Sequence, residues 1–372
     1  MRDKLRTWIE INTKALTHNY RFFRSWMKPQ IKLLAVTKSN AYGHSLVDYA
    51  KLMSKLGADY LGVDSIVEAL TLRQAKITKP ILVLGYSLSA FYSQAAKQKI
   101  ILSLSSFDQL NDLEKFARTT RTPLAIHLKI DTGMHRQGFS LIDLPEALAR
   151  LTKIKASIKV SGIYSHLAAP AELKFKSATQ KQIANFHTAV RLAAEAGFSN
   201  LIRHLSATGG TLYWPEAHFD LVRVGIGLYG YLPGDDLKTK RPVNLKPALT
   251  WKTIISEIKA VPKGESVGYS FTAKLKRDSR LAILPIGYWH GYPRLLSNQG
   301  EVLINGQRAK LIGRVSMDML IIDVTDLKNC RCGDEAILLG PQLSPQELAQ
   351  KTGTTHYEIL TRINPRIKKF YL

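Results

Sequence analysis

The sequence predicts a two-domain α/β protein: a (β/α)8 barrel of the TIM type, followed by a mostly β domain. The chain has 372 residues, more than one small domain needs. Apolar, β-branched runs alternate with stretches of helical spacing over the first two-thirds of the chain. This alternation stops near residue 238, where Gly, Pro and Asn begin to separate short apolar runs. We therefore expect the barrel in residues 1–238 and the β domain in residues 239–372.

Eight apolar runs are the candidate barrel strands: 33–38, 60–65, 80–85, 101–106, 124–130, 159–167, 201–206 and 221–230. Amphipathic stretches between them predict helices, for example 48–57, 107–118, 144–153 and 180–197. Near-continuous apolar strands that alternate with helices indicate a parallel sheet covered by helices. The strand count favours a closed barrel over an open, doubly wound sheet. The first strand is not followed by a GxGxxG turn, which also argues against a dinucleotide-binding fold.

The second part of the chain has the pattern of a β domain. Residues 238–248, "KTKRPVNLKPA", are polar and contain proline, so they predict a linker. Strand-like runs follow, and helical spacing is nearly absent until "SPQELAQKTG" at 344–353. The strand-like runs lie at 250–261, 280–287, 301–313 and 320–326.

Composition limits the functional classes. The chain is 45% hydrophobic and its net charge is +24. Such a charge allows binding to nucleic acid or to an anionic membrane surface. However, the basic residues are spread along the sequence and do not interleave with aromatic residues in a known nucleic-acid motif. We therefore expect the charge to serve solubility and the attraction of small anions, with neither nucleic acid nor membrane as a partner.

Targeting and metal-binding signals are weak. No apolar run approaches the ~20 residues that span a bilayer. The N-terminal segment lacks the apolar core of a secretion signal. Cys330 and Cys332 are too close and too few for a disulfide framework or a four-ligand zinc site. We expect a cytoplasmic protein with reduced thiols and no metal.

A lysine stands out at the end of the first predicted barrel strand, in "AVTKSNAYGHS" at 35–45. The carboxyl ends of barrel strands carry the chemistry of this fold, so Lys38 is expected at the mouth of the barrel. A lysine there can be an ion-pair partner, a phosphate ligand or a Schiff-base nucleophile. Its position alone favours the ion pair.

The other strand ends favour a reactive lysine. Lys129 and Arg136 flank the end of the fifth strand, and His166 ends the sixth. The seventh brings His204, Ser206 and Thr208, and the eighth brings Arg223 with a glycine-rich turn. Backbone N–H groups after the seventh and eighth strands are the usual phosphate site of such barrels. Pyridoxal phosphate fits this rim, since it has an aldehyde for Lys38 and a phosphate for the turn.

At this point the sequence resembles a known family, the alanine racemases. "AVTKSNAYGHS" is similar to the family's cofactor-attachment motif, and the resemblance extends over nearly the whole chain. The other matching segments keep the family's order and approximate spacing: "HLKIDTGMHRQG", "VRVGIGLYG", "VGYS" (267–270), "GYPRLLSN" (291–298) and "GRVSMDM" (313–319). The resemblance implies a fold-type III pyridoxal-phosphate enzyme that interconverts L- and D-alanine and supplies D-alanine for cell-wall peptidoglycan.

The resemblance implies two bases on opposite faces of the substrate. Lys38 would carry the cofactor and serve the D-enantiomer, and Tyr269 would serve the L-enantiomer. Tyr269 and Met317 would reach the site of the other subunit of a homodimer. Because a free tyrosine is a poor base at neutral pH, Tyr269 needs cationic neighbours, and we expect His166 and Arg223 to supply them.

The remaining implied roles concern the cofactor and the substrate. Arg223 would hydrogen-bond the pyridine nitrogen, and Arg136 would meet the substrate carboxylate. Lys129 would carry a carbamate or remain an unmodified lysine. The residues implied to hold the phosphate are Tyr42, Thr208, Gly225, Ile226 and Tyr357.

Several positions depart from the family pattern, without loss of a catalytic group. His135 stands where glycine is common, and Ser39 where alanine is. Trp289 and His290 replace small and acidic residues near the expected substrate entrance, which leaves the substrate range open.

Other functions remain as alternatives. A broader-specificity amino-acid or serine racemase of the same fold would usually have a secretion signal. A barrel decarboxylase would need an acidic residue in place of Arg223, and a single-barrel pyridoxal-phosphate carrier needs neither Tyr269 nor Met317. A nucleic-acid-binding protein is supported only by the net charge.

Overall fold

The computed structural model describes residues 4–234 and 242–372. The chain forms two compact units. One contains residues 17–41 and 46–246, and the other contains residues 1–16, 42–45 and 247–372. The expected boundary between residues 238 and 239 lies outside the described residues.

Within the described residues, eight parallel strands form the sheet of the first unit, in the order β8-β7-β6-β5-β4-β3-β2-β9. Between β8 and β9, the Arg223 N–H donates to Ser206 O and the Asp220 N–H to Arg203 O, so the barrel is nearly closed. Each predicted barrel strand is present, which confirms the predicted fold class. The strands are β2 (Lys32–Val36), β3 (Tyr60–Val63), β4 (Ile81–Val83), β5 (Ile100–Leu104), β6 (Leu124–Lys129), β7 (Ile158–Tyr164), β8 (Ile202–His204) and β9 (Leu221–Val224).

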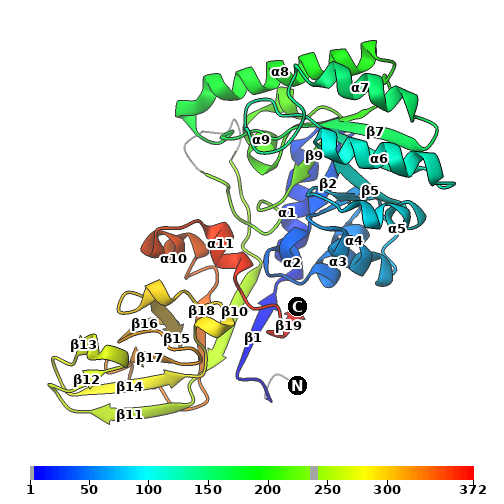
Figure 1. Cartoon of the computed structure of the whole chain (residues 1–372). Coiled ribbons are helices and arrows are strands. Elements are labelled where there is room, and N and C mark those ends of the chain that lie inside the picture. Colours follow the sequence, from blue (N-terminus) through cyan, green and yellow to red (C-terminus); the bar gives the residue numbers. More distant parts are fainter. Residues whose placement is uncertain (1–3, 235–241) are drawn as a thin grey trace. The chain divides into compact units, whose positions relative to one another are not determined.

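Helices follow most of these strands and cover the outside of the sheet (Figure 1). In the seventh helix, Leu144, Ala147, Leu148 and Leu151 are buried, the spacing of one helical face. The helices are α1 (Thr13–Trp26), α2 (Lys38–Tyr42), α3 (Leu46–Leu56), α4 (Ile66–Gln74), α5 (Tyr92–Lys97), α6 (Phe107–Thr119), α7 (Leu144–Lys153), α8 (Lys176–Glu195) and α9 (Thr208–Tyr213).

The described residues of the second unit contain a nine-stranded sheet, in the order β11-β14-β17-β16-β15-β18-β10-β1-β19. Trp251 and Tyr292 are fully buried in this unit. Two short strands and two α-helices also belong to it: β12 (Ser266–Val267), β13 (Ala273–Lys274), α10 (Pro345–Thr352) and α11 (His356–Thr361). The long sheet consists of β1 (Thr7–Ile11), β10 (Leu249–Ile254), β11 (Glu257–Val261), β14 (Ser279–Leu284), β15 (Glu301–Ile304), β16 (Gln307–Leu311), β17 (Leu320–Asp323), β18 (Glu335–Leu339) and β19 (Lys369–Tyr371).

The first strand of the chain belongs to this β unit, which differs from the expected division. β1 pairs antiparallel with β10 and parallel with β19. Residues 1–16 therefore group with the C-terminal residues, because the backbone hydrogen bonds of β1 are made there. The partners of β1 lie more than 230 residues away in sequence, so local periodicity does not reveal them.

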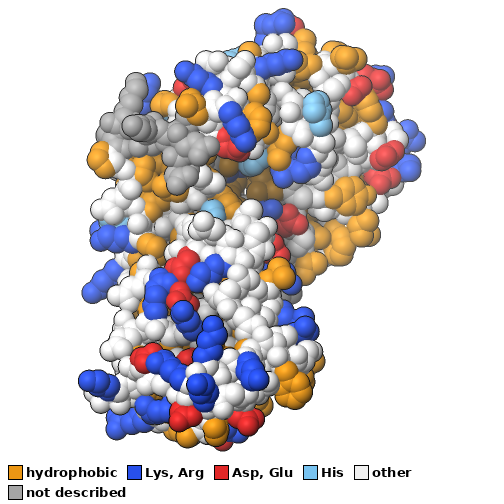
Figure 2. Space-filling view, turned by 90° about the vertical axis from the view of Figure 1, so that its left-hand side faces the viewer, with side chains coloured by type: hydrophobic (Ala, Val, Ile, Leu, Met, Phe, Trp, Pro, Cys, Tyr) orange, Lys and Arg blue, Asp and Glu red, His pale blue; other side chains and the backbone are white. Residues whose placement is uncertain are grey.

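The surface carries basic residues on many elements. Lysine and arginine side chains are spread over the visible face and stand beside acidic ones (Figure 2). Among the described residues, no helix has the length and apolar character needed to cross a membrane.

Candidate active site

Lys38 begins an unusual turn after the first barrel strand. The sequence predicted that Lys38 ends the strand, but β2 ends at Val36 and Lys38 begins the short segment α2. The next four residues, 39–42, all have left-handed backbone angles, with φ between 50° and 55°. Left-handed backbone costs about 1–2 kcal/mol for each L-residue other than glycine. A run of four such residues persists only where the surrounding structure imposes it.

Side chains from the next turns hold this backbone in place. Glu68, in α4, accepts hydrogen bonds from the Asn40 N–H at 3.2 Å and from the Asp64 N–H at 2.9 Å. The Asn40 side chain in turn accepts from the Leu46 N–H at 3.0 Å. The turns after β2 and β3 are therefore joined through one carboxylate. Sequence analysis did not identify Glu68, since its role depends on this contact between turns.

The Lys38 amine forms an ion pair that is open to solvent. Its Nζ lies 3.4 Å from Asp64 Oδ1, and the two side chains are 37% and 56% exposed. The ion pair considered for Lys38 is present, but an exposed pair of this kind contributes at most about 1 kcal/mol. The pairing therefore leaves the amine available to a ligand.

Lys129 differs from Lys38, because it is buried at the end of β6. Its Nζ donates to Gln137 Oε1 at 2.9 Å. Burial, as the largest cause, and the charges of Arg136, Arg223 and Lys38 together lower the pKa of this amine to about 8. The charges that lower the pKa of Lys129 thus come from Lys38, Arg136 and Arg223, which lie near it on the first unit.

Arg136 lies exposed in the loop after β6. Asp131 shapes this loop by accepting N–H hydrogen bonds from Gly133, Met134 and His135 at 2.9–3.1 Å. His135 has a φ of 54°, a left-handed conformation that glycine adopts more easily. The family commonly has glycine at this position, and His135 adopts a backbone conformation that suits glycine.

Arg223 is buried and bonded to uncharged acceptors. Its Nη1 donates to His204 Nδ1 at 2.9 Å, and its Nη2 donates to the carbonyls of Ser165 and Leu205 at 2.7 and 2.9 Å. Nη2 also lies 3.2 Å from His166 Nδ1. Burial lowers the pKa of the guanidinium to about 10, which leaves it charged at neutral pH. A buried cation without a bonded carboxylate favours an anionic or electron-rich ligand.

His166 does not supply the positive charge that the sequence analysis expected. Burial and the charges of Arg223, Arg136, Lys129 and Lys38 hold its pKa well below the usual value of histidine. At neutral pH the ring is therefore uncharged. It accepts from Arg223 and leaves that guanidinium as the cation.

Thr208 lies where a phosphate site was predicted. Its Oγ1 accepts from the Gly225 N–H at 3.2 Å and from the Gly227 N–H at 3.4 Å. Because both lone pairs are engaged, the hydroxyl proton is free to point to another acceptor. The neighbouring Ser206 differs, since its hydroxyl donates to Ala217 O at 2.8 Å within the core.

Four predicted site residues lie in the β unit. The rings of Tyr42 and Tyr357 approach each other at 6.1 Å, and burial raises the pKa of Tyr357. Tyr269 and Met317 are exposed, at 67% and 52%. Their predicted places at a second copy of the chain remain predictions.

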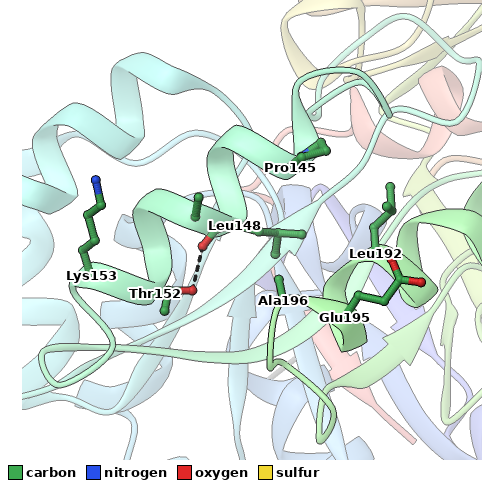
Figure 3. Close-up of a pocket in the computed structure, with 8 residues that line it drawn as sticks. Pro145, Leu148, Thr152, Lys153, Leu192, Glu195 and Ala196 are labelled. Carbon is green, nitrogen blue, oxygen red and sulfur yellow. Dashed lines mark hydrogen bonds between the residues drawn. The ribbon is translucent and has the colours of Figure 1, made fainter.

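A separate groove lies between α7 and α8, on the outside of the barrel (Figure 3). Its volume is about 560 Å³. None of the predicted site residues lines it. The lining residues are Pro145, Leu148, Ala149, Thr152, Lys153, Leu192, Glu195 and Ala196.

The fold and the site geometry define the class of protein. It has a nearly closed (β/α)8 barrel with a cluster of cations at the carboxyl ends of the strands, and a mostly β unit is formed largely by the residues that follow the barrel in sequence. The family model described as "Alanine racemase, N-terminal domain" matches residues 11–233. The family model described as "Alanine racemase, C-terminal domain" matches residues 248–371. The chain belongs to the alanine racemase family, a family of isomerases.

Individual relatives agree over the full length. The alanine racemase of Methanococcus maripaludis is 37% identical, with 98% of each chain covered. The alanine racemase structure from Streptomyces lavendulae is 34% identical, with a TM-score of 0.93 over 99% of this chain and 97% of that one. The Bacillus anthracis alanine racemase with bound L-Ala-P is 32% identical, with a TM-score of 0.93 over 99% and 95%.

Proposed function

We propose that the protein interconverts L- and D-alanine with pyridoxal phosphate as its cofactor. The observation that carries the proposal is the cation cluster of Lys38, Lys129, Arg136 and Arg223, in which Arg223 is buried among uncharged acceptors. A phosphorylated cofactor and a carboxylate substrate together supply the negative charge that this cluster attracts.

The chain's own residues fit this cofactor. Thr208 offers a hydroxyl proton beside the glycine-rich turn, where Ile226 would supply a backbone N–H group. The Gly225 N–H donates to Thr208 Oγ1, so Gly225 would act by orienting that hydroxyl. Tyr42 and Tyr357 would complete the phosphate ligands, and Arg223 would donate to the pyridine nitrogen. When bound, pyridoxal phosphate withdraws electrons from the substrate α-carbon and so acidifies its proton.

Two bases would move that proton. Lys38, whose amine has only an exposed partner, would hold the cofactor and serve the D-enantiomer. Tyr269 of a second copy would serve the L-enantiomer on the opposite face, and Met317 of that copy would line the substrate site. The exposure of both side chains in the single chain suits contact with another subunit. Since His166 is uncharged, the stabilisation of a tyrosinate falls to Arg223.

The substrate carboxylate would be bound by Arg136, which a carbamate on Lys129 would orient. The biological role we propose is the supply of D-alanine for cell-wall peptidoglycan, by a cytoplasmic homodimer. The relatives named alanine racemase support this proposal.

Exchange of the α-proton tests the proposal. The protein is incubated in deuterium oxide with L-alanine, D-alanine or L-serine, and deuterium at the α-carbon is followed by NMR. We expect fast exchange and inversion of both alanine enantiomers. Lys38→Ala should abolish both and remove the visible absorbance of bound cofactor. Lys32→Ala, which changes an exposed lysine at the start of β2, the strand before Lys38, is the matched control. Faster exchange of serine than of alanine, or undiminished exchange by Lys38→Ala, would contradict the assignment.

A further inference from the structure

Two buried histidines extend from Arg223 into the barrel interior. Arg223 Nη1 lies 2.9 Å from His204 Nδ1, and His204 Nε2 lies 2.8 Å from His127 Nδ1. His127 is on β6 and His204 on β8, with β7 between them. Both rings are buried, at 1% and 0% exposure. The three side chains therefore form one continuous chain of hydrogen bonds across the barrel.

The chemistry of arginine sets the direction of this chain. A guanidinium only donates, so His204 Nδ1 must accept and carry no proton. The neutral ring of His204 then bears its proton on Nε2 and donates to His127 Nδ1. His127 in turn bears its proton on Nε2, which has no hydrogen-bond partner in the described part of the chain. Burial lowers the pKa of His127 to about 3 and that of His204 well below its usual value, in agreement with two neutral rings.

Gly162 provides the space that this arrangement needs. It is paired with His127 across the β6–β7 ladder, directly after a register shift between Ile126 and His127. A Cβ atom at Gly162 would lie 2.7 Å from three ring atoms of His127, closer than side chains tolerate. The imidazole thus occupies the volume of the side chain that Gly162 lacks, and it reaches across β7 to His204.

Tyr164 fixes the plane of the middle ring. It stacks on His204 with centroids 4.7 Å apart and an interplanar angle of 2°. Its hydroxyl is held 2.7 Å from Ser103 Oγ. His204 therefore has little freedom to turn, and its tautomer depends on the groups that face its two nitrogens, Arg223 at Nδ1 and His127 at Nε2.

We propose that His127 is a positioning residue for Arg223 and acts through His204. By accepting from His204 Nε2, it keeps His204 Nδ1 unprotonated, so that Arg223 Nη1 has an acceptor and its guanidinium a fixed direction. A proton on His204 Nδ1 would oppose the arginine donor and push it away. The inference rests on the proposed function in one respect, the role of Arg223 at the cofactor.

Nitrogen NMR of the holoenzyme tests this directly. In protein labelled with ¹⁵N-histidine, we expect His204 to show an unprotonated Nδ1 and a protonated Nε2. A scalar coupling through the hydrogen bond should join His204 Nε2 to His127 Nδ1. His127→Leu should shift His204 towards the Nδ1-protonated tautomer. His127→Asn, whose side-chain oxygen can replace Nδ1 as acceptor, should restore the wild-type tautomer.

His218→Asn is the matched control. His218 is buried on the same unit, but its Nε2 donates to the Thr211 carbonyl oxygen at 2.8 Å, outside the chain of three residues. This variant should leave the His204 tautomer unchanged. In the alanine assay, His127→Leu should lower kcat roughly tenfold with little change in KM, and His127→Asn should recover most of it.

Three results would overturn the proposal: a wild-type His204 protonated on Nδ1, the absence of the coupling to His127, or an unchanged His204 tautomer in His127→Leu. The first two need no variant, so a misfolded His127→Leu does not prevent the decision. Because the tautomer is measured without turnover, a protein that fails to racemise alanine but shows these tautomers refutes the proposed function alone.

Discussion

At the scale of single residues, the two lysines of the site have separate roles because their surroundings differ. Lys38 pairs with an exposed carboxylate, whereas Lys129 is buried beside other cations. A pKa of about 8 gives Lys129 a substantial neutral fraction near neutral pH. A neutral amine is the form that attacks CO2, and the resulting carbamate would reverse the charge at this position within the cation cluster.

We predict that Lys129 carries a carbamate. In ¹³C-bicarbonate at fixed CO2 pressure, the holoenzyme should show one carbamate carbon signal that grows as the pH rises through about 8, because deprotonation of the amine is the limiting step. Lys129→Gln should lose the signal. Lys369→Gln is the control, since burial also lowers the pKa of Lys369 to about 8 but its Nζ donates to the carbonyls of Asn364 and Pro365. Loss of the signal in the control, with retention in Lys129→Gln, would refute the assignment.

The residues that sequence analysis missed have roles that depend on tertiary contacts. Lys38 and Lys129 could be found because each lies at or beside the carboxyl end of a predicted strand, and Arg223 because a glycine-rich turn follows it. His127 lies inside a strand, and its contact with His204 depends on Gly162, 35 positions later. The charge of His166 was predicted wrongly because its burial and cationic neighbours cannot be read from the local sequence.

At the scale of elements, the barrel strands are predictable and the turn after the first one is not. Buried parallel strands are almost continuously apolar, so their positions can be predicted from apolar runs in the sequence. By contrast, residues 39–42 adopt four consecutive left-handed conformations, although none of them is glycine. Glu68 accepts hydrogen bonds from the backbone at Asn40 and Asp64, and such a tertiary contact to this turn cannot be read from local propensity.

We predict that the stability of the protein depends on how well the residue at position 39 tolerates a left-handed backbone conformation. Ser39→Val should lower the free energy of unfolding by about 1–2 kcal/mol, because a β-branched residue is poorly compatible with positive φ. Ser39→Gly should be neutral or raise it by up to about 1 kcal/mol. Urea denaturation measures both, and Ser39→Ala serves as the control that keeps the left-handed cost. Equal stability of the valine and glycine variants would show that the turn is not strained.

At the scale of the whole molecule, local sequence patterns predicted two domains but misassigned the N-terminal residues. The predicted change near residue 238 falls between the two family matches, of which the first ends at residue 233 and the second begins at residue 248. The pairing of β1 with β10 and β19, distant in sequence, places this strand with the β unit. Pairing over such separations is invisible to periodicity.

Exposed aromatic residues of the β unit bear on how two copies of the molecule could associate. Tyr269 and Phe271 are 67% and 74% exposed in a short helical segment with positive φ at Ser270. Exposed aromatic side chains of this kind are typical of protein interfaces. This exposure supports the central claim of our proposal, that each active site combines Lys38 of one copy with Tyr269 of another.

Mixing two inactive variants tests this claim most directly. Lys38→Ala and Tyr269→Phe are each purified and incubated with pyridoxal phosphate. The two proteins are then mixed in equal amounts and allowed to exchange subunits, and alanine racemisation is measured against time. If the sites are shared, every heterodimer contains one site with both defects and one intact site. Activity should then rise to about half that of wild type per heterodimer. If Tyr269 acts within its own chain, every site keeps one defect, and a mixture that exchanges subunits but stays inactive would contradict the account.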